Sequence, residues 1–214
     1  MIRAEDNSFA HWIIDMYLNF LLKKDFGKLI FSGKIQNTIG PLVITPNHIS
    51  WWDGFFIYYA VKKHFKRVPH ILMLEDQLEK YWFFKYTGCF GINPKNPSSI
   101  IEASDYISEI LNGKNSCVVI YIQGEIEPQD KKPLSLKSGL KYFLRKAPAE
   151  TNLLNCAFRI QYGTKRKPDV FYKFSEFCPL TRFNLHPDAY YDDFLSNISG
   201  LEKEVINSLK QENE

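Results

Sequence analysis

The chain has 214 residues, of which 45% are hydrophobic and 24% charged. This length suits one domain with a sizeable core, and the composition excludes a disordered or collagen-like chain. The net charge of +3, with both signs interspersed, is too weak to indicate nucleic-acid binding, although it suits an anionic membrane surface or a phosphorylated substrate. The aromatic share of 15% is high, and Tyr and Trp favour places with one apolar and one wet end, such as membrane interfaces.

Four cysteines are far apart in the sequence and form no C-x-x-C pair: Cys89, Cys117, Cys156 and Cys178. We therefore expect no zinc or other metal site and no disulfide framework, but buried thiols in a reducing, cytoplasmic compartment. The first residues carry acids without a cleavable apolar core, so we expect no signal peptide. No uncharged apolar stretch reaches the about eighteen residues of a transmembrane helix.

The first predicted element is an amphipathic helix within residues 1–27, which we treat as a unit apart from the main domain of residues 28–214. Its apolar positions follow helical spacing: Phe9, Trp12, Ile13, Met16, Tyr17 and Phe20. Ile14, Leu18 and Leu22 widen this apolar face. A face that wide is either packed on the domain or laid on a bilayer, and the sequence leaves both open.

Strands and helices alternate along the rest of the chain. Strands are predicted at 28–32, 42–45, 69–74, 89–92, 116–122, 153–160 and 170–174, and helices at 51–64, 78–86, 97–111, 138–146 and 190–210. The aromatic segment 78–86 is either a core helix or a membrane-facing lip of an acyl groove. This order predicts a single α/β domain with a mixed, mostly parallel sheet flanked by helices.

A histidine and an aspartate, His48 and Asp53, are separated by four residues just after the strand predicted at 42–45. A neutral imidazole can take a proton from a hydroxyl, and a nearby carboxylate can hold its tautomer. The segment from Ser50 to Asp53 also fits a helix capping box. Because five positions on a helix turn a side chain by about 140°, His48 is expected before the helix, with Ser50 near the N-cap and Asp53 in the first turn. The capping and catalytic interpretations are thus compatible.

The motif Asn47-His48-Ile49-Ser50-Trp51-Trp52-Asp53 resembles the signature of the glycerolipid (lysophospholipid) acyltransferase family, in which an asparagine precedes a histidine and an aspartate four residues apart. The resemblance covers roughly residues 28–160, with further blocks in family order. It implies an α/β sheet with flanking helices, bound to one membrane leaflet through its N-terminal region.

The second block resembles Gly-x-x-Phe-Ile-x-Arg at Gly88 to Pro94. The family's arginine position falls on Pro94. Lys95 is then the nearby cation that would bind a phosphate, with Asn93 beside it, although a lysine offers a point charge rather than a fork. Alternatively, Lys95 is a solvated loop residue.

The third block resembles Phe-Pro-Glu-Gly-Thr at Tyr121 to Glu125. Gln123 replaces the glutamate and carries no charge, whereas Gly124 is kept and permits a close backbone approach to substrate. Downstream, the segment from Leu136 to Gly139 resembles Phe-Lys-x-Gly, and Lys137 there would bind a phosphate or stabilise an oxyanion. The last block lacks its usual proline.

The resemblance implies transfer of an acyl group from acyl-CoA or an acyl-carrier protein to a hydroxyl of a lysophospholipid or another lipid alcohol. His48 would be the general base and Asp53 its orienting partner, with no cofactor and with the protein on the inner face of the membrane. The groove would draw on Trp51, Trp52, Phe55 and Phe90, each of which also suits a plain core. A non-catalytic membrane-binding relative and an acyl-thioester hydrolase are the alternatives.

Overall fold

The computed structural model describes residues 1–35 and 39–211. Within these ranges, eight strands form one sheet in the order β1-β7-β6-β2-β5-β3-β4, and β8 pairs with β6. Their bounds are β1 Leu29–Ser32, β2 Leu42–Pro46, β3 Pro69–Leu74, β4 Cys89–Ile92, β5 Cys117–Val119, β6 Asn152–Gln161, β7 Asp169–Phe174 and β8 Cys178–Pro179. Only β6 with β7 and β6 with β8 pair antiparallel among these strands. The predicted α/β domain with a mixed, mostly parallel sheet is confirmed.

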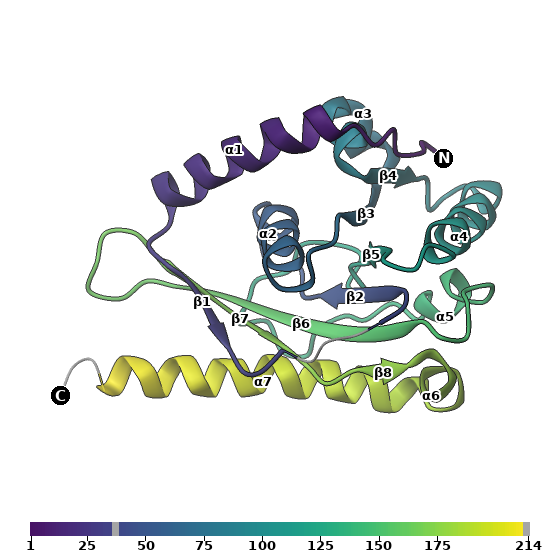
Figure 1. The fold of residues 1–214 in the computed structure, drawn as a ribbon. Coiled ribbons are helices and arrows are strands. Elements are labelled where there is room, and N and C mark those ends of the chain that lie inside the picture. Colours follow the sequence, from purple (N-terminus) through teal and green to yellow (C-terminus); the bar gives the residue numbers. More distant parts are fainter. Residues whose placement is uncertain (36–38, 212–214) are drawn as a thin grey trace.

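Helices cover both faces of the sheet. Their bounds are α1 Ser8–Asp25, α2 Asp53–Phe65, α3 Glu75–Lys80, the 3-10 helix η1 Trp82–Thr87, α4 Pro97–Leu111, α5 Leu140–Phe143, α6 Leu180–Leu185 and α7 Pro187–Gln211. Figure 1 shows α1 and α2 on one side of the central strands and α7 along the opposite side. Each face has its own hydrophobic cluster, so the strands between them are buried from both sides.

The central strand β2 explains where the site forms. All five of its residues are buried, with Leu42 and Ile44 in the cluster under α2 and Val43 in the opposite cluster. Its parallel neighbour β5 pairs through Ile44 with Val119. Because parallel neighbours end at the same edge, the segments that follow β2 and β5 emerge side by side.

Several elements differ from the sequence-based expectation. The strand predicted at 116–122 ends at Val119, because the chain turns at Tyr121, whose carbonyl accepts from the amide of Gly124 at 3.1 Å. The helix predicted at 138–146 covers only Leu140–Phe143. The segment 78–86 divides into α3 and η1 at Tyr81, whose backbone is not helical. The short elements β8 and α6 were not predicted, because they show no hydrophobic periodicity.

Helix α1 has two apolar faces. Ile14, Leu18 and Leu22 are buried against the domain. The other face is open to solvent and includes Phe9, Trp12, Ile13, Met16, Tyr17 and Phe20, with Phe9 67% exposed and Trp12 59% exposed. The helix thus packs on the domain and still presents an aromatic surface outward. Trp82 and Phe83 of η1 are exposed as well.

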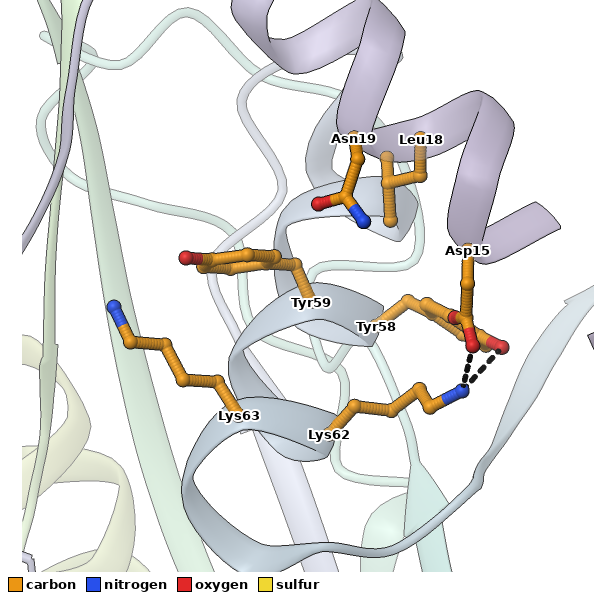
Figure 2. Close-up of a pocket in the computed structure, with 7 residues that line it drawn as sticks. All are labelled: Asp15, Leu18, Asn19, Tyr58, Tyr59, Lys62 and Lys63. Carbon is orange, nitrogen blue, oxygen red and sulfur yellow. Dashed lines mark hydrogen bonds and ion pairs between the residues drawn. The ribbon is translucent and has the colours of Figure 1, made fainter. Parts of the chain in front are cut away.

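Polar contacts fix α1 on α2. Figure 2 shows Asp15 of α1 and Lys62 of α2 joined in an ion pair beside Tyr58, around a shallow cavity of about 260 Å³. His11 contacts the Tyr58 hydroxyl at 2.9 Å. Burial, with the nearby charge of Asp15, raises the pKa of Tyr58 well above its ordinary value. Tyr58 is therefore a neutral hydroxyl that joins the two helices.

The N-terminal segment is held by a carboxylate between two imidazoles. Asp6 lies 2.8 Å from Nε2 of His70 and 3.4 Å from Nε2 of His11. Burial opposes ionisation of Asp6, but hydrogen bonds from His11 and His70 outweigh it and hold the pKa of Asp6 far below its usual range. These contacts anchor the segment that precedes α1.

Candidate active site

His48 and Asp53 face each other across the junction of β2 and α2. The Nδ1 atom of His48 lies 2.9 Å from Oδ2 of Asp53. The Asp53 side chain is fully buried, whereas the His48 side chain is 23% exposed. With Nδ1 engaged by the carboxylate, Nε2 is the ring nitrogen left for a substrate. The pair has the geometry of a base and its orienting group.

Asp53 also organises the loop that carries His48. Its Oδ2 accepts from the backbone amides of Ile49 at 2.5 Å and Ser50 at 2.8 Å, and its Oδ1 accepts from the Ser50 hydroxyl at 2.7 Å. Ser50 Oγ in turn accepts from the amide of Trp52 at 3.2 Å. Asp53 thus bonds back to the Ser50 amide as in a capping box, but the hydroxyl of Ser50 does not bond the amide of Asp53, and the N-cap of α2 is Trp52 rather than Ser50. Four donors therefore satisfy a carboxylate that is shielded from water.

Both end residues of the segment from Gln123 to Glu127 form hydrogen bonds with the backbone of His48. Gln123 Oε1 accepts from the His48 amide at 2.6 Å, and Gln123 Nε2 donates to the His48 carbonyl at 3.3 Å. The same carbonyl accepts from the amide of Glu127 at 2.9 Å. Gln123, predicted as a substrate-binding residue, is fully buried and contacts the protein.

Glu127 was not singled out in the sequence, yet it is buried and central to this loop. Its carboxylate accepts from Gln123 Nε2 and from the amide of Ser135, both at 3.2 Å, and pairs with Lys131. These hydrogen bonds, that of Lys131 first, lower the pKa of Glu127 to about 2. No short sequence motif predicts such a residue, because only the fold brings its hydrogen-bond partners together.

Gly124 adopts a left-handed conformation with φ of +75°, which disfavours any residue with a Cβ. A Cβ at this position would stand 3.4 Å from Cγ of Lys137. The structure thus brings Gly124 and Lys137 together, as two of the predicted substrate-binding residues. The amide of Lys137 is not free, since it donates to the carbonyl of Ile122 at 2.7 Å.

A cavity of about 770 Å³ opens beside His48. This volume is in the range of small-molecule sites. Its lining is mainly apolar and includes Ile14, Trp51, Phe55, Tyr58, Ile71, Leu72, Met73, Leu74, Tyr81, Phe84, Cys89, Ile92, Ile120 and Tyr121. Of the four aromatic residues expected in a groove, Trp51 and Phe55 line this cavity. Trp52 and Phe90 pack in the hydrophobic clusters instead.

Two of the predicted substrate-binding residues, Asn93 and Lys95, are not among the residues that line this cavity. The Asn93 side chain accepts from the amide of Lys95 at 3.0 Å and so shapes the loop before α4. Pro94, between them, does line the cavity. Lys95 is exposed to solvent.

Two neighbours of His48, Tyr121 and Asn47, lie in the motifs of the sequence analysis but were given no role there. The ring of Tyr121 lies 4.3 Å from the ring of His48, and its hydroxyl is buried without a hydrogen-bond partner among the described residues. Burial raises the pKa of Tyr121 well above its ordinary value. Asn47 exchanges hydrogen bonds of 2.7 and 2.9 Å with the backbone of Phe158, which ties the His48 loop to β6.

The cysteine that lines the cavity is not an activated nucleophile. Cys89 lines the cavity, and burial raises the pKa of its thiol to about 12. A thiol rather than a thiolate is therefore present at neutral pH, and a thiol is the weaker nucleophile.

Comparison with known proteins identifies the family of this chain. A protein-family model described as Acyltransferase matches residues 28–159, which is more than half of the chain and includes His48, Asp53 and Gln123. The chain belongs to the acyltransferase family. It is therefore an acyl-transferring enzyme, and the interpretation as a non-catalytic relative is set aside.

The acyltransferase also resembles a solved structure, the 1-acyl-sn-glycerophosphate (LPA) acyltransferase PlsC from Thermotoga maritima. The TM-score is 0.61 at 17% sequence identity, and the match covers 89% of this chain and 78% of the other. At this identity the likeness establishes the fold. No sequence among curated proteins matches the acyltransferase. None of its described helices is both long and apolar enough to cross a membrane.

Proposed function

We propose that this acyltransferase moves a fatty acyl group from an acyl thioester, acyl-CoA or an acyl-carrier protein, to a hydroxyl of a lysophospholipid or a related lipid alcohol. The observation that carries the proposal is the His48–Asp53 pair, joined at 2.9 Å, at a largely apolar cavity of about 770 Å³. The apolar lining suits a hydrocarbon chain, because each buried methylene contributes about 0.8 kcal/mol.

In the proposed reaction, Nε2 of His48 takes the proton of the acceptor hydroxyl while the oxygen of that hydroxyl attacks the thioester carbonyl. The carbon–sulfur bond then breaks, the new ester keeps the acyl group, and the proton passes from His48 to the departing sulfur, which leaves as a thiol. Asp53 stabilises the imidazolium formed in between. General-base assistance of this kind contributes roughly two to four powers of ten in rate.

No enzyme nucleophile and no cofactor is required in this scheme, because the acceptor hydroxyl attacks directly. The loop from Gln123 to Glu127 holds the backbone of His48, and Asp53 holds its ring. Because both its backbone and its ring are held, His48 has little freedom to move and is oriented for proton transfer before the substrates bind. The proposal therefore assigns binding and orientation to the cavity and proton transfer to His48.

We further propose that the enzyme is peripheral on the inner face of the membrane. The exposed aromatic face of α1, with Trp82 and Phe83 of η1, supports this assignment. Lys23 and Lys24 in the last turn of α1 add positive charge beside it. Aromatic side chains flanked by lysines are typical of surfaces that lie in the headgroup region of anionic bilayers.

The test is a transfer assay with palmitoyl-CoA and with palmitoyl-acyl-carrier protein, using a total bacterial lipid extract as the acceptor pool. Released thiol and lipid products are measured by absorbance and mass spectrometry for the wild type and for His48→Ala. A new acylated lipid that disappears in His48→Ala supports transfer. Free fatty acid without a new lipid would identify a hydrolase, and equal products from both proteins would contradict the role of His48.

A further inference from the structure

We infer that the acceptor headgroup carries no phosphate monoester, and that Glu125 selects against one. This inference rests on the proposed function and names the chemistry of its acceptor, a headgroup with no net negative charge. The geometry points to Glu125 because it is the one carboxylate among the described residues that line the cavity. Glu125 would determine which acceptor is used, whereas His48 and Asp53 carry out the proton transfer.

The charges at the cavity balance each other. Apart from His48, the ionisable side chains in its lining with a formal charge at neutral pH are Glu125 and Lys137, within the described part of the chain. Lys95 lies outside the lining. One lysine and one glutamate give a site of no net charge. A phosphate monoester carries close to two negative charges at neutral pH, which such a site leaves uncompensated.

Glu125 belongs to the loop that holds the backbone of His48, and it lines the cavity beside His48. The side chain of Gln123 and the amide of Glu127 both bond the peptide of His48, so Glu125 stands midway between two fixed attachments. Gly124, just before it, is in contact range of the Lys137 side chain. Glu125, Lys137 and His48 thus line the same cavity, in which the acceptor hydroxyl has to reach His48.

Neither charged group takes part in holding the protein together. In the part of the chain that the structure describes, no side-chain hydrogen bond or ion pair joins the Glu125 carboxylate or the Lys137 ammonium group to another residue. Glu125 is exposed to the solvent of the cavity. A charge without a structural partner at a binding site acts on the ligand, and a like charge on the ligand is disfavoured.

The experiment compares two acceptors that differ only in the phosphate, 1-oleoylglycerol and 1-oleoylglycerol 3-phosphate, in the same uncharged detergent micelles and with one donor. The readout is the ratio of kcat/KM for the phosphorylated acceptor to that for the neutral one. The wild type is expected to favour the neutral acceptor. Glu125→Lys is expected to raise the ratio about 100-fold and Glu125→Gln about 10-fold, mainly through KM.

Glu176→Lys is the matched control, since Glu176 is exposed on the loop after β7, away from the cavity lining. It applies the same change in net charge and is expected to leave the ratio unchanged. A wild type that favours the phosphorylated acceptor, or a ratio that Glu125→Lys does not move beyond this control, would overturn the inference.

Acceptor binding without donor separates this inference from the proposed function. Trp51 lines the cavity, so its fluorescence reports binding of either acceptor once Trp12, Trp52 and Trp82 are replaced by phenylalanine. The ratio of the two Kd values should shift in Glu125→Lys as the kinetic ratio does. Normal binding preferences without any transfer would contradict the proposed function alone, whereas a Kd ratio unaffected by Glu125→Lys would contradict the inference, with or without turnover.

Discussion

The side chain of Gln123 bonds both backbone polar groups of His48, accepting from its amide at 2.6 Å and donating to its carbonyl at 3.3 Å. Only a group that both accepts and donates can do this, and an amide does while a carboxylate does not. The resemblance to the family places a glutamate at this position, so the glutamine is a property of this chain. A carboxylate is nevertheless present beside Gln123, because Oε2 of Glu127 accepts from Gln123 Nε2 at 3.2 Å.

Gln123→Glu should impair the enzyme for this reason. The new carboxylate would face both the His48 carbonyl and the Glu127 carboxylate, with the donor removed. We expect kcat to fall at least about 10-fold and the free energy of unfolding to fall by about 1–3 kcal/mol, measured by transfer assay and urea denaturation.

A second substitution tests the explanation. Gln123→Glu combined with Glu127→Gln returns one amide to the pair and should recover most of the lost activity. Asn184→Asp, on the exposed surface of α6, is the control and should change stability by less than about 0.5 kcal/mol. If the double variant is no better than Gln123→Glu alone, the two side chains do not act as a pair.

Asp53→Asn should separate orientation of the base from binding of substrate. The amide keeps one acceptor oxygen but cannot serve both the His48 ring and the amides of Ile49 and Ser50. We expect kcat to fall by a factor of about 10² to 10⁴ with KM little changed, measured by initial rates at several acceptor concentrations. Asp192→Asn, on the exposed surface of α7, should behave as wild type. A variant within threefold of wild type in kcat would refute the orienting role of Asp53.

Gly124→Ala and Gly54→Ala should have opposite effects on stability. Gly124 has φ of +75° and would place a Cβ against Lys137, so alanine should cost about 1–2 kcal/mol. Gly54 lies in α2 with nothing within 4 Å of an added Cβ, so alanine should stabilise by about 0.5–1 kcal/mol. Urea unfolding of both variants measures the difference. Equal effects would mean that the backbone at Gly124 is not left-handed in solution.

The two faces of α1 should separate membrane binding from folding. Trp12→Ser with Phe20→Ser removes exposed aromatic side chains, so flotation with anionic vesicles should fall while the Tm stays unchanged. Leu18→Ala removes a side chain that is only 3% exposed and should cost about 2–5 kcal/mol of stability. Vesicle binding that survives the double serine variant would move the membrane contact away from α1.

His64 makes stability depend on pH. Burial, with Lys63 and Lys66 nearby, lowers the pKa of His64 from 6.5 to about 4. A depressed pKa means that the unfolded chain binds more protons in this range, so stability is fully present above about pH 6.5 and is lost as the pH falls toward 4.

His64→Gln should flatten this part of the curve of Tm against pH, while keeping a donor or acceptor for the hydroxyl of Tyr172, which lies 2.8 Å from His64. Thermal unfolding between pH 7 and 4 measures the difference between the two proteins. His186→Gln, at the end of α6, is the control. Parallel curves for the wild type and His64→Gln would show that another group carries the dependence.

The sequence by itself determined the features that depend on neighbours a few residues away. The placement of His48 before a helix and of Asp53 in its first turn follows from how a helix begins, whereas the N-cap is Trp52 and not Ser50. Similarly, the spacing of apolar residues predicted α1, and the order of strands and helices predicted the class of sheet. Each of these is a local periodicity or a local hydrogen bond.

The tertiary structure decided what depends on contacts between distant segments. Two lysines were candidates for the site, and only the folded chain brings Lys137 to the cavity and leaves Lys95 outside its lining. Gln123 bonds a peptide 75 residues away because β2 and β5 are neighbours in the sheet. Which face of α1 is buried depends on the helix α2 beneath it. Strand order and helix packing arise from the shape of the whole core, which local periodicity does not encode.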